Sequence, residues 1–168
     1  MDRLFYELIR MSIGVCSGLS SIPSNQEWLS LRTMAMKQAI DGLAFEGFII
    51  YKDKASDVQK YQELKLQWMA SVLQLEQRNE LTNLRAQQLT KFFENGGFRT
   101  CVLKGQGVAL LYPNSKRRRC GDIDLWVEGE RDDIVNFIRS KGVKIYDVHL
   151  VHATAEFFKD VPVEIHFC

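Results

Sequence analysis

The stretch RRRCGDIDLWV, residues Arg117–Val127, places two carboxylates in what otherwise reads as a hydrophobic strand. Because side chains two residues apart in a strand point to the same side, the apolar residues are expected to face a core. Asp122, Asp124 and Trp126 then lie on the opposite face. Neighbouring carboxylates repel each other unless a cation lies between them, and Mg²⁺ prefers oxygen ligands. The stretch is therefore a candidate metal site; the alternative is a half-exposed strand with an acidic outer face.

A second stretch, VPVEIHF at residues 161–167, has the same alternation. Glu164 and His166 alternate with branched apolar residues, which predicts that both lie on one face of a strand. If this strand lies beside the first, Glu164 converges with Asp122 and Asp124. Three carboxylates can hold two Mg²⁺ or Mn²⁺ ions for an in-line displacement at phosphorus. His166 is expected beside the metals as an outer-shell partner.

The stretch LKGQG, residues 103–107, places glycines where a strand ends and a helix begins. Bare backbone amides at such a turn bind phosphate oxygens. Lys104 adds a positive charge directly before Gly105, which favours a phosphate-binding turn. The alternative is an ordinary connection between a strand and a helix.

A basic run, Lys116–Arg119, precedes the two aspartates by a few residues. A solvated loop is one interpretation of this run. In the functional interpretation, Arg119 offsets the charge of the carboxylates and contacts a triphosphate through its planar guanidinium.

Three histidines support a weaker alternative, a zinc site built from His149, His152 and His166. His149 and His152 are separated by two residues. That spacing suits two metal ligands on a helix but not on a strand.

The first half of the chain has the apolar periodicity of helices. One helix is predicted over Trp28–Phe48, with Ser24 or Asn25 as its N-cap and Gly47 as its stop. A second is predicted from Asp57 to Asn95, where no Gly or Pro occurs, with a break near residues 78–80 as an option because of its length.

Strand patterns alternate with helix patterns after residue 97, which predicts a sheet layer. We therefore predict an α+β protein with a helical region at 1–97 and an α/β core at 98–168. Because the chain stops within a strand pattern, we expect it to be truncated at its C-terminus relative to a longer protein.

The motifs LKGQGVALLYP, RRRCGDIDLWV and VEIHF, in this order, resemble the DNA polymerase beta-type nucleotidyltransferase superfamily. Together they look like the bacterial branch often called uncharacterised nucleotidyltransferases, and the helical segment EWLSLRTMAMKQ resembles that branch too. The resemblance implies an N-terminal helical layer followed by a nucleotidyltransferase-like mixed sheet flanked by helices. It also implies a Mg²⁺-dependent enzyme that transfers NMP from an NTP to a hydroxyl of an acceptor that the sequence does not identify.

By this resemblance Asp122 and Asp124 are metal ligands, and Glu164 is the third carboxylate, placed to accept a proton from the attacking hydroxyl. Gly105 marks the nucleotide-phosphate turn. Gln106 stands where the superfamily usually has a serine that contacts a phosphate. This departure supports an alternative function, a catalytically degenerate module that binds a nucleotide or a protein partner.

The overall composition restricts the class of protein. The formal net charge is +1, from 22 basic and 21 acidic residues, which does not indicate nucleic-acid binding by bulk electrostatics. No stretch has the apolar length needed to cross a bilayer. The four cysteines form no CxxC pair, so we expect a reduced protein in the cytoplasm.

Overall fold

The computed structural model describes residues 2–54 and 61–167 of the chain. Contacts between Cα atoms divide it into two compact units. The first comprises Met1–Arg78 and Leu111–Arg119, and the second comprises Asn79–Leu110 and Cys120–Cys168. The boundary predicted after residue 97 marks the change from helices to strands. The division between the compact units lies elsewhere, between residues 78 and 79, inside a long helix.

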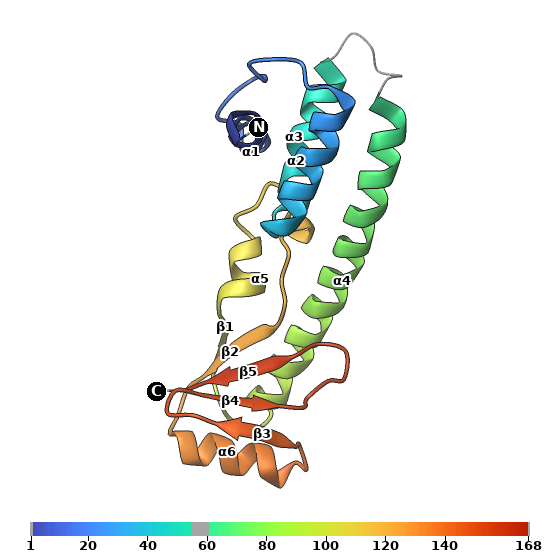
Figure 1. Cartoon of the computed structure of the whole chain (residues 1–168). Helices are drawn as coiled ribbons and strands as arrows, with labels where there is room; N and C mark the ends of the chain where they lie inside the picture. The colour runs from blue at the N-terminus through green and yellow to red at the C-terminus, as the bar shows by residue number, and fades with distance from the viewer. Residues whose placement is uncertain (1, 55–60, 168) are drawn as a thin grey trace. The chain divides into compact units, whose positions relative to one another are not determined.

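Helices make up most of the first unit (Figure 1). They are α1 (Asp2–Ser12), α2 (Asn25–Lys37), α3 (Asp41–Lys54) and the first part of α4 (Gln62–Glu94), together with the short 3-10 helix η2 (Ser115–Arg117). Their core is rich in aromatic residues, and Trp28, Phe48 and Trp68 are fully buried. The Phe48 and Trp68 rings stack with their centroids 5.4 Å apart.

The predicted N-cap of α2 is confirmed at Ser24. Its hydroxyl accepts a hydrogen bond from the Glu27 backbone N–H (3.3 Å), and the Glu27 carboxylate accepts one from the Ser24 N–H (2.8 Å). The prediction of one helix over 28–48 is wrong, because α2 ends at Lys37 and α3 begins at Asp41. Ala39 between them has a φ of 57°, in the left-handed region that ends helices.

Gly47 does not end α3, as predicted, but lies inside it. A Cβ atom added at Gly47 would lie 2.3 Å from the Leu8 carbonyl oxygen of α1. The glycine therefore allows the backbones of α1 and α3 to approach closely. Periodicity within one helix carries no information about such an approach.

The variant Gly47→Ala is expected to lower the free energy of unfolding by about 1–2 kcal/mol. Overpacking costs about 1–3 kcal/mol, and a clash with the Leu8 backbone oxygen belongs to the upper part of this range, about 2–3 kcal/mol, because no side-chain rotation relieves it. This cost outweighs the roughly 1 kcal/mol gained from helix propensity. Urea unfolding measures the change. Gly18→Ala is the control, because a Cβ at Gly18 meets no atom within 4 Å. An equally stable Gly47→Ala variant would contradict the close approach.

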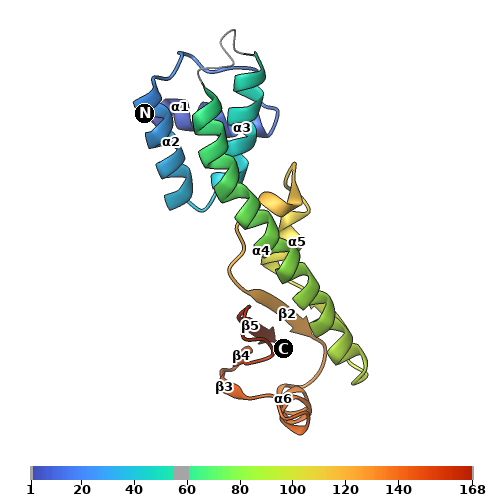
Figure 2. The ribbon, with the colours of Figure 1, turned by 90° about the vertical axis from the view of Figure 1, so that its right-hand side faces the viewer.

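Helix α4 runs without interruption from Gln62 to Glu94 (Figure 2), so the optional break near residues 78–80 is absent. Its predicted beginning at Asp57 lies outside the described residues. Its predicted end is confirmed, since Gly97 has a φ of 85° just after the last helical turn. No helix within residues 2–54 and 61–167 combines enough length with enough apolar residues to cross a membrane.

The second unit contains a five-stranded mixed sheet with the strand order β1-β2-β5-β4-β3. The strands are β1 (Thr100–Val102), β2 (Ile123–Val127), β3 (Ile145–Val148), β4 (His152–Ala155) and β5 (Val163–His166). Strands β2 and β5 are parallel, and the other neighbouring pairs are antiparallel. With α5 (Lys104–Ala109) and α6 (Arg131–Ser140), this confirms the predicted α+β class.

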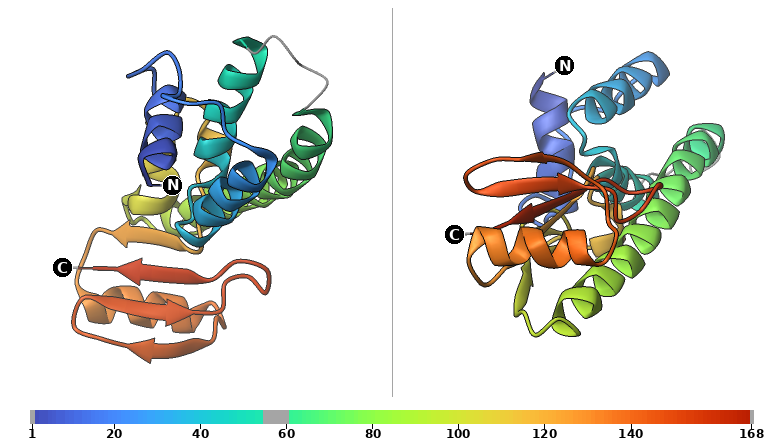
Figure 3. Two further views of the ribbon diagram at one scale, coloured as in Figure 1. Left: turned by 45° about the horizontal axis from the view of Figure 1, so that its top comes forward. Right: turned by 90° about the horizontal axis from the view of Figure 1, so that it is seen from below.

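One face of the sheet carries the apolar core of this unit, and α6 covers that face (Figure 3). The predicted alternation in β2 is confirmed, since Ile123, Leu125 and Val127 are at most 1% exposed. The second part of α4 adds Leu89 and Phe93 to the same core. We call the opposite side, which bears Asp124, Glu164, His166 and His152, the polar face of the sheet.

An ion pair joins α4 to the loop before β5. The Arg85 Nη2 atom lies 2.7 Å from Asp160 Oδ2, and the guanidinium lies over the Phe158 ring. The hydrogen bond from Arg85 lowers the pKa of Asp160 below its usual value. The pair therefore helps hold the second part of α4 in place within the second unit.

Candidate active site

The parallel pairing of β2 with β5 brings the two acidic motifs together. Asp124 lies directly opposite Glu164, and Trp126 lies opposite His166. The prediction that the second strand lies beside the first is therefore confirmed. Because β2 and β5 are hydrogen-bonded neighbours inside the sheet, these side chains project from rigid backbone onto the polar face.

Asp124, Glu164 and His166 form the one grouping among the described residues in which three ligand atoms could hold a metal ion. Those atoms all lie within 4.8 Å of one another. Two carboxylate oxygens suit a hard divalent cation, so the donor set fits Mg²⁺ or Mn²⁺. Asp122 precedes the first residue of β2, is partly exposed, and is outside this grouping.

Two cationic or hydrogen-bonding groups converge on one oxygen of Asp124. Lys104 Nζ lies 3.0 Å from Asp124 Oδ1, and His166 Nε2 lies 2.8 Å from the same atom. The Asp124 side chain is buried, which by itself would raise its pKa. Hydrogen bonds from Lys104 and then His166 outweigh this burial, so the pKa of Asp124 is lowered.

The negative charges of all three carboxylates act on the ammonium of Lys104. Its hydrogen bond to Asp124 raises the pKa of the Lys104 ammonium, and the charges of Asp124, Glu164 and Asp122 raise it further. The side chain is 65% exposed although its tip is bound. Water can solvate the exposed ammonium when it moves away from Asp124, whereas the buried Asp124 carboxylate then needs another cation beside it.

The turn between β1 and α5 aims Lys104 at Asp124. Lys104 has a φ of 35°, and Gly105 has a φ of 3° and a ψ of −100°, both outside the usual helical region. A non-glycine residue in such a conformation costs about 1–3 kcal/mol, a cost characteristic of functional turns. The Leu103 N–H donates to the Asp124 carbonyl at 2.8 Å, which fixes this turn against β2.

Gln106, predicted at the phosphate turn, is buried and has partners inside its own unit. Its Nε2 donates to the Asn79 carbonyl at 3.4 Å, and its Oε1 accepts from Cys120 Sγ at 3.2 Å. The side chain thus links the beginning of α5 to α4 and to the segment before β2. A phosphate contact by Gln106 stays a prediction.

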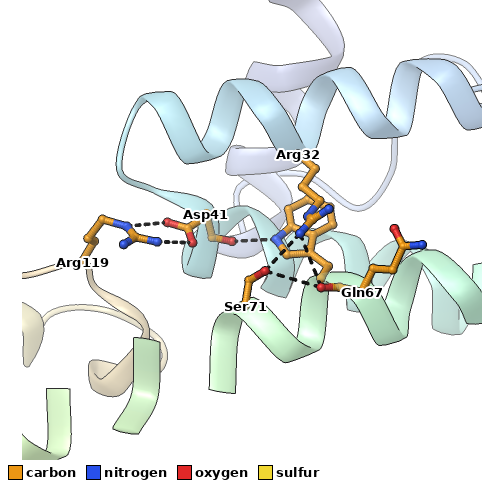
Figure 4. Close-up of polar contacts among 6 residues, drawn as sticks. Arg32, Asp41, Gln67, Ser71 and Arg119 are labelled. Atoms are coloured by element: carbon orange, nitrogen blue, oxygen red, sulfur yellow. Dashed lines mark hydrogen bonds and ion pairs between the residues drawn. The ribbon is translucent and has the colours of Figure 1, made fainter. Parts of the chain in front are cut away.

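Arg119, predicted beside the two aspartates, instead binds Asp41 at the beginning of α3 (Figure 4). Its Nε and Nη2 atoms lie 3.0 and 2.7 Å from the two oxygens of Asp41, which is fully buried. The Trp68 indole N–H donates to the Asp41 carbonyl at 3.2 Å. Sequence analysis did not identify Asp41, since it lies inside what was predicted as one helix.

Arg117 makes a similar contact within the first unit. It pairs with Glu46 at 2.8 Å and with Glu76 at 2.6 Å, and its guanidinium lies over the Phe45 ring. Together Arg117 and Arg119 fasten the segment 111–119 to the helices. The basic run therefore has a packing role, and a contact of Arg119 with a triphosphate stays a prediction.

Comparison with known proteins identifies a family for this chain. The model of a family described as "Uncharacterised nucleotidyltransferase" matches residues 24–168. No curated protein and no solved structure matches this chain. The matched range contains all five strands and the residues Lys104, Asp122, Asp124, Glu164 and His166.

Proposed function

The chain belongs to the uncharacterised nucleotidyltransferase family, and from this premise we propose that it transfers a nucleotidyl group from an NTP to an acceptor hydroxyl. The observation that carries the proposal is the register of β2 and β5, which places Asp124 directly opposite Glu164. We further propose that the DNA polymerase beta-type fold and the two-ion chemistry implied by the sequence resemblance apply here.

The donor set supports a divalent cation held by Asp124 and Glu164. A contribution by Asp122, whose charge acts on the same Lys104 ammonium, stays a prediction. Such an ion, Mg²⁺ or Mn²⁺, would neutralise phosphate charge and acidify the attacking hydroxyl. Asp124 suits the role of a fixed ligand, since it is buried and held by Lys104 and His166. His166 keeps the Asp124 carboxylate in one orientation.

Glu164 is the residue we assign to proton transfer. It is more accessible than Asp124, with 35% of its side chain exposed, so an acceptor hydroxyl can reach it. The acceptor oxygen forms a bond to the α-phosphorus, the bond from that phosphorus to pyrophosphate breaks, and the hydroxyl proton passes to Glu164. Lys104, after leaving Asp124, is placed to contact the departing phosphates.

A second candidate function is nucleotide binding without transfer. The observation that favours it is Gln106, whose side chain is bound to Asn79 and Cys120. The superfamily usually has a serine here that contacts a phosphate. The second candidate predicts that the chain binds an NTP but releases no pyrophosphate.

An assay with labelled NTPs and Mg²⁺ or Mn²⁺ distinguishes the two candidate functions. We expect pyrophosphate release by the unmodified chain and a loss of roughly 10²–10⁴-fold in the variant Glu164→Gln, the range typical of a general base. NTP affinity, measured by calorimetry, is expected to fall by much less than the rate, because Asp124 still holds the cation.

Glu128→Gln is the matched control for this assay. Glu128 is an exposed carboxylate that follows β2 and pairs with Arg99 outside the metal-capable grouping. Binding without pyrophosphate release in the unmodified chain would establish the second candidate. Equal rates for Glu164→Gln and the unmodified chain would remove Glu164 from the mechanism.

We also propose a cytoplasmic location. Cys16, Cys101 and Cys120 form no disulfide among the described residues. Reduced thiols are the usual state of cysteines in that compartment.

A further inference from the structure

The three histidines form a row across the polar face of the sheet. His166 of β5 pairs with His152 of β4 in the antiparallel register, and the His149 N–H donates to the His152 carbonyl at 2.8 Å. The ring centroids of His152 and His166 are 5.7 Å apart, and those of His149 and His152 are 4.6 Å apart. The row therefore begins at the carboxylate site and ends at the hairpin between β3 and β4.

The hairpin removes the objection that the spacing of His149 and His152 does not suit a strand. Val148 pairs with Ala153, so the two histidines are the next residues along the hairpin, and Leu150 and Val151 form its turn. Residues opposite each other across two antiparallel strands have side chains on the same face. The two imidazoles consequently lie side by side, although they are separated by three positions in the sequence.

Asp147 gives His149 the environment of a metal ligand. Its Oδ2 atom lies 2.9 Å from Nε2 of His149, the residue that directly follows β3. Histidines that bind metals commonly donate their other ring nitrogen to a carboxylate, which fixes the orientation of the ring. With Nε2 held by Asp147, Nδ1 is the His149 nitrogen left for an ion.

We propose that His149 and His152 bind a late first-row transition metal ion, with Zn²⁺ as the representative, at a site separate from the carboxylate site. Imidazole nitrogen suits Zn²⁺, Ni²⁺ and Cu²⁺, whereas Mg²⁺ requires oxygen ligands. His166 does not belong to this site, because its Nε2 is bound to Asp124.

The exposure of His149 indicates that the proposed site leaves coordination positions of the metal ion open. Its side chain is 54% exposed, so an ion held by the two imidazoles keeps open coordination positions for water or another ligand. Closed structural zinc sites have four protein ligands, whereas sites with open positions have fewer. The hairpin site thus binds its ion reversibly.

Zinc titration of the full chain in the presence of excess Mg²⁺ tests the proposal. Calorimetry gives the stoichiometry, and the ¹⁵N resonances of the imidazoles identify the ligands, because the chain has only three histidines. We expect one bound Zn²⁺, with resonance shifts at His149 and His152. His149→Gln and His152→Gln each lower the affinity at least about tenfold, and Asp147→Asn lowers it by roughly 10–100-fold.

Asp124→Asn is the matched control for this titration, and it is expected to bind zinc as the unmodified chain does. This control separates the hairpin site from the proposed transferase site, since the readout is binding rather than activity. The proposal is overturned if no zinc binds, if the shifts are confined to His166, or if Asp124→Asn rather than the hairpin variants abolishes binding. Circular dichroism establishes that each variant is folded.

Discussion

Replacing Asp124 with asparagine is expected to lower nucleotidyl transfer on the order of 10³-fold or more while leaving the chain folded. Asp124 is buried to 4% exposure and lies opposite Glu164, so its carboxylate is the most rigid oxygen donor of the site. Removing its charge takes away the negative partner that a divalent cation requires, and electrostatic contributions of this kind are typically the largest in an active site. Steady-state rates of pyrophosphate release measure the loss.

Stability is expected to change by only about 1–2 kcal/mol in the same variant. The asparagine oxygen can still accept one of the two hydrogen bonds that Lys104 and His166 make at 3.0 and 2.8 Å. Lys104 is mostly exposed, so water can solvate its ammonium when the charge of Asp124 is gone. A loss of activity therefore reports on chemistry rather than on unfolding.

Asp132→Asn provides the control. Asp132 is an exposed carboxylate in the first turn of α6, with 77% of its side chain accessible, and it is outside the metal-capable grouping. Its substitution should leave the rate unchanged. Full activity in Asp124→Asn would exclude the carboxylate pair as the catalytic centre.

The candidate site could be predicted in part because it depends on strand periodicity. A period of two places Asp124 on one face of β2 and Glu164 with His166 on one face of β5. The pairing of β2 with β5 is a long-range contact that neither segment encodes by itself. The sequence analysis assumed that the two strands are neighbours, and the convergence of their side chains followed from that assumption. The direct bond between His166 and Asp124 follows from that pairing, whereas sequence analysis placed His166 only in an outer shell.

Other features that depend on contacts between distant segments were not predicted. Gly47 reads as a helix stop in the sequence, but its role depends on the Leu8 carbonyl of another helix. Similarly, His149 and His152 have an unfavourable spacing for ligands on one strand, and only the tight turn between β3 and β4 makes them neighbours. Local periodicity describes each element, but the approach of one element to another requires the fold.

The Arg119 contact is another case in which a distant partner changed the interpretation of a motif. The sequence predicted that Arg119 offsets the charges of Asp122 and Asp124, which follow within a few residues. In the structure its guanidinium makes two hydrogen bonds to Asp41, 78 residues earlier in the chain. A planar guanidinium is suited to any carboxylate that it meets in this geometry, so the residue type alone does not identify the partner.

Replacing Arg119 with methionine is expected to destabilise the first unit by about 2 kcal/mol. Removing one partner of a buried ion pair costs about 3–5 kcal/mol, because a charge is left without compensation. Asp41 is fully buried and would be that charge, but the Arg119 side chain is 42% exposed, so solvent screening reduces the cost. Urea unfolding monitored by tryptophan fluorescence measures the change, since Trp68 donates to the Asp41 carbonyl.

The exposed pair of Arg99 and Glu128 is the matched control for this measurement. Arg99→Met removes a guanidinium that is 83% exposed, and such surface pairs contribute little to stability. The double variant Asp41→Asn with Arg119→Met should recover part of the lost stability, because it removes the buried charge together with its partner. If Arg119→Met unfolds at the same urea concentration as Arg99→Met, the pair with Asp41 does not fasten residues 111–119 to the helices, and Arg119 becomes available again as a ligand for phosphate.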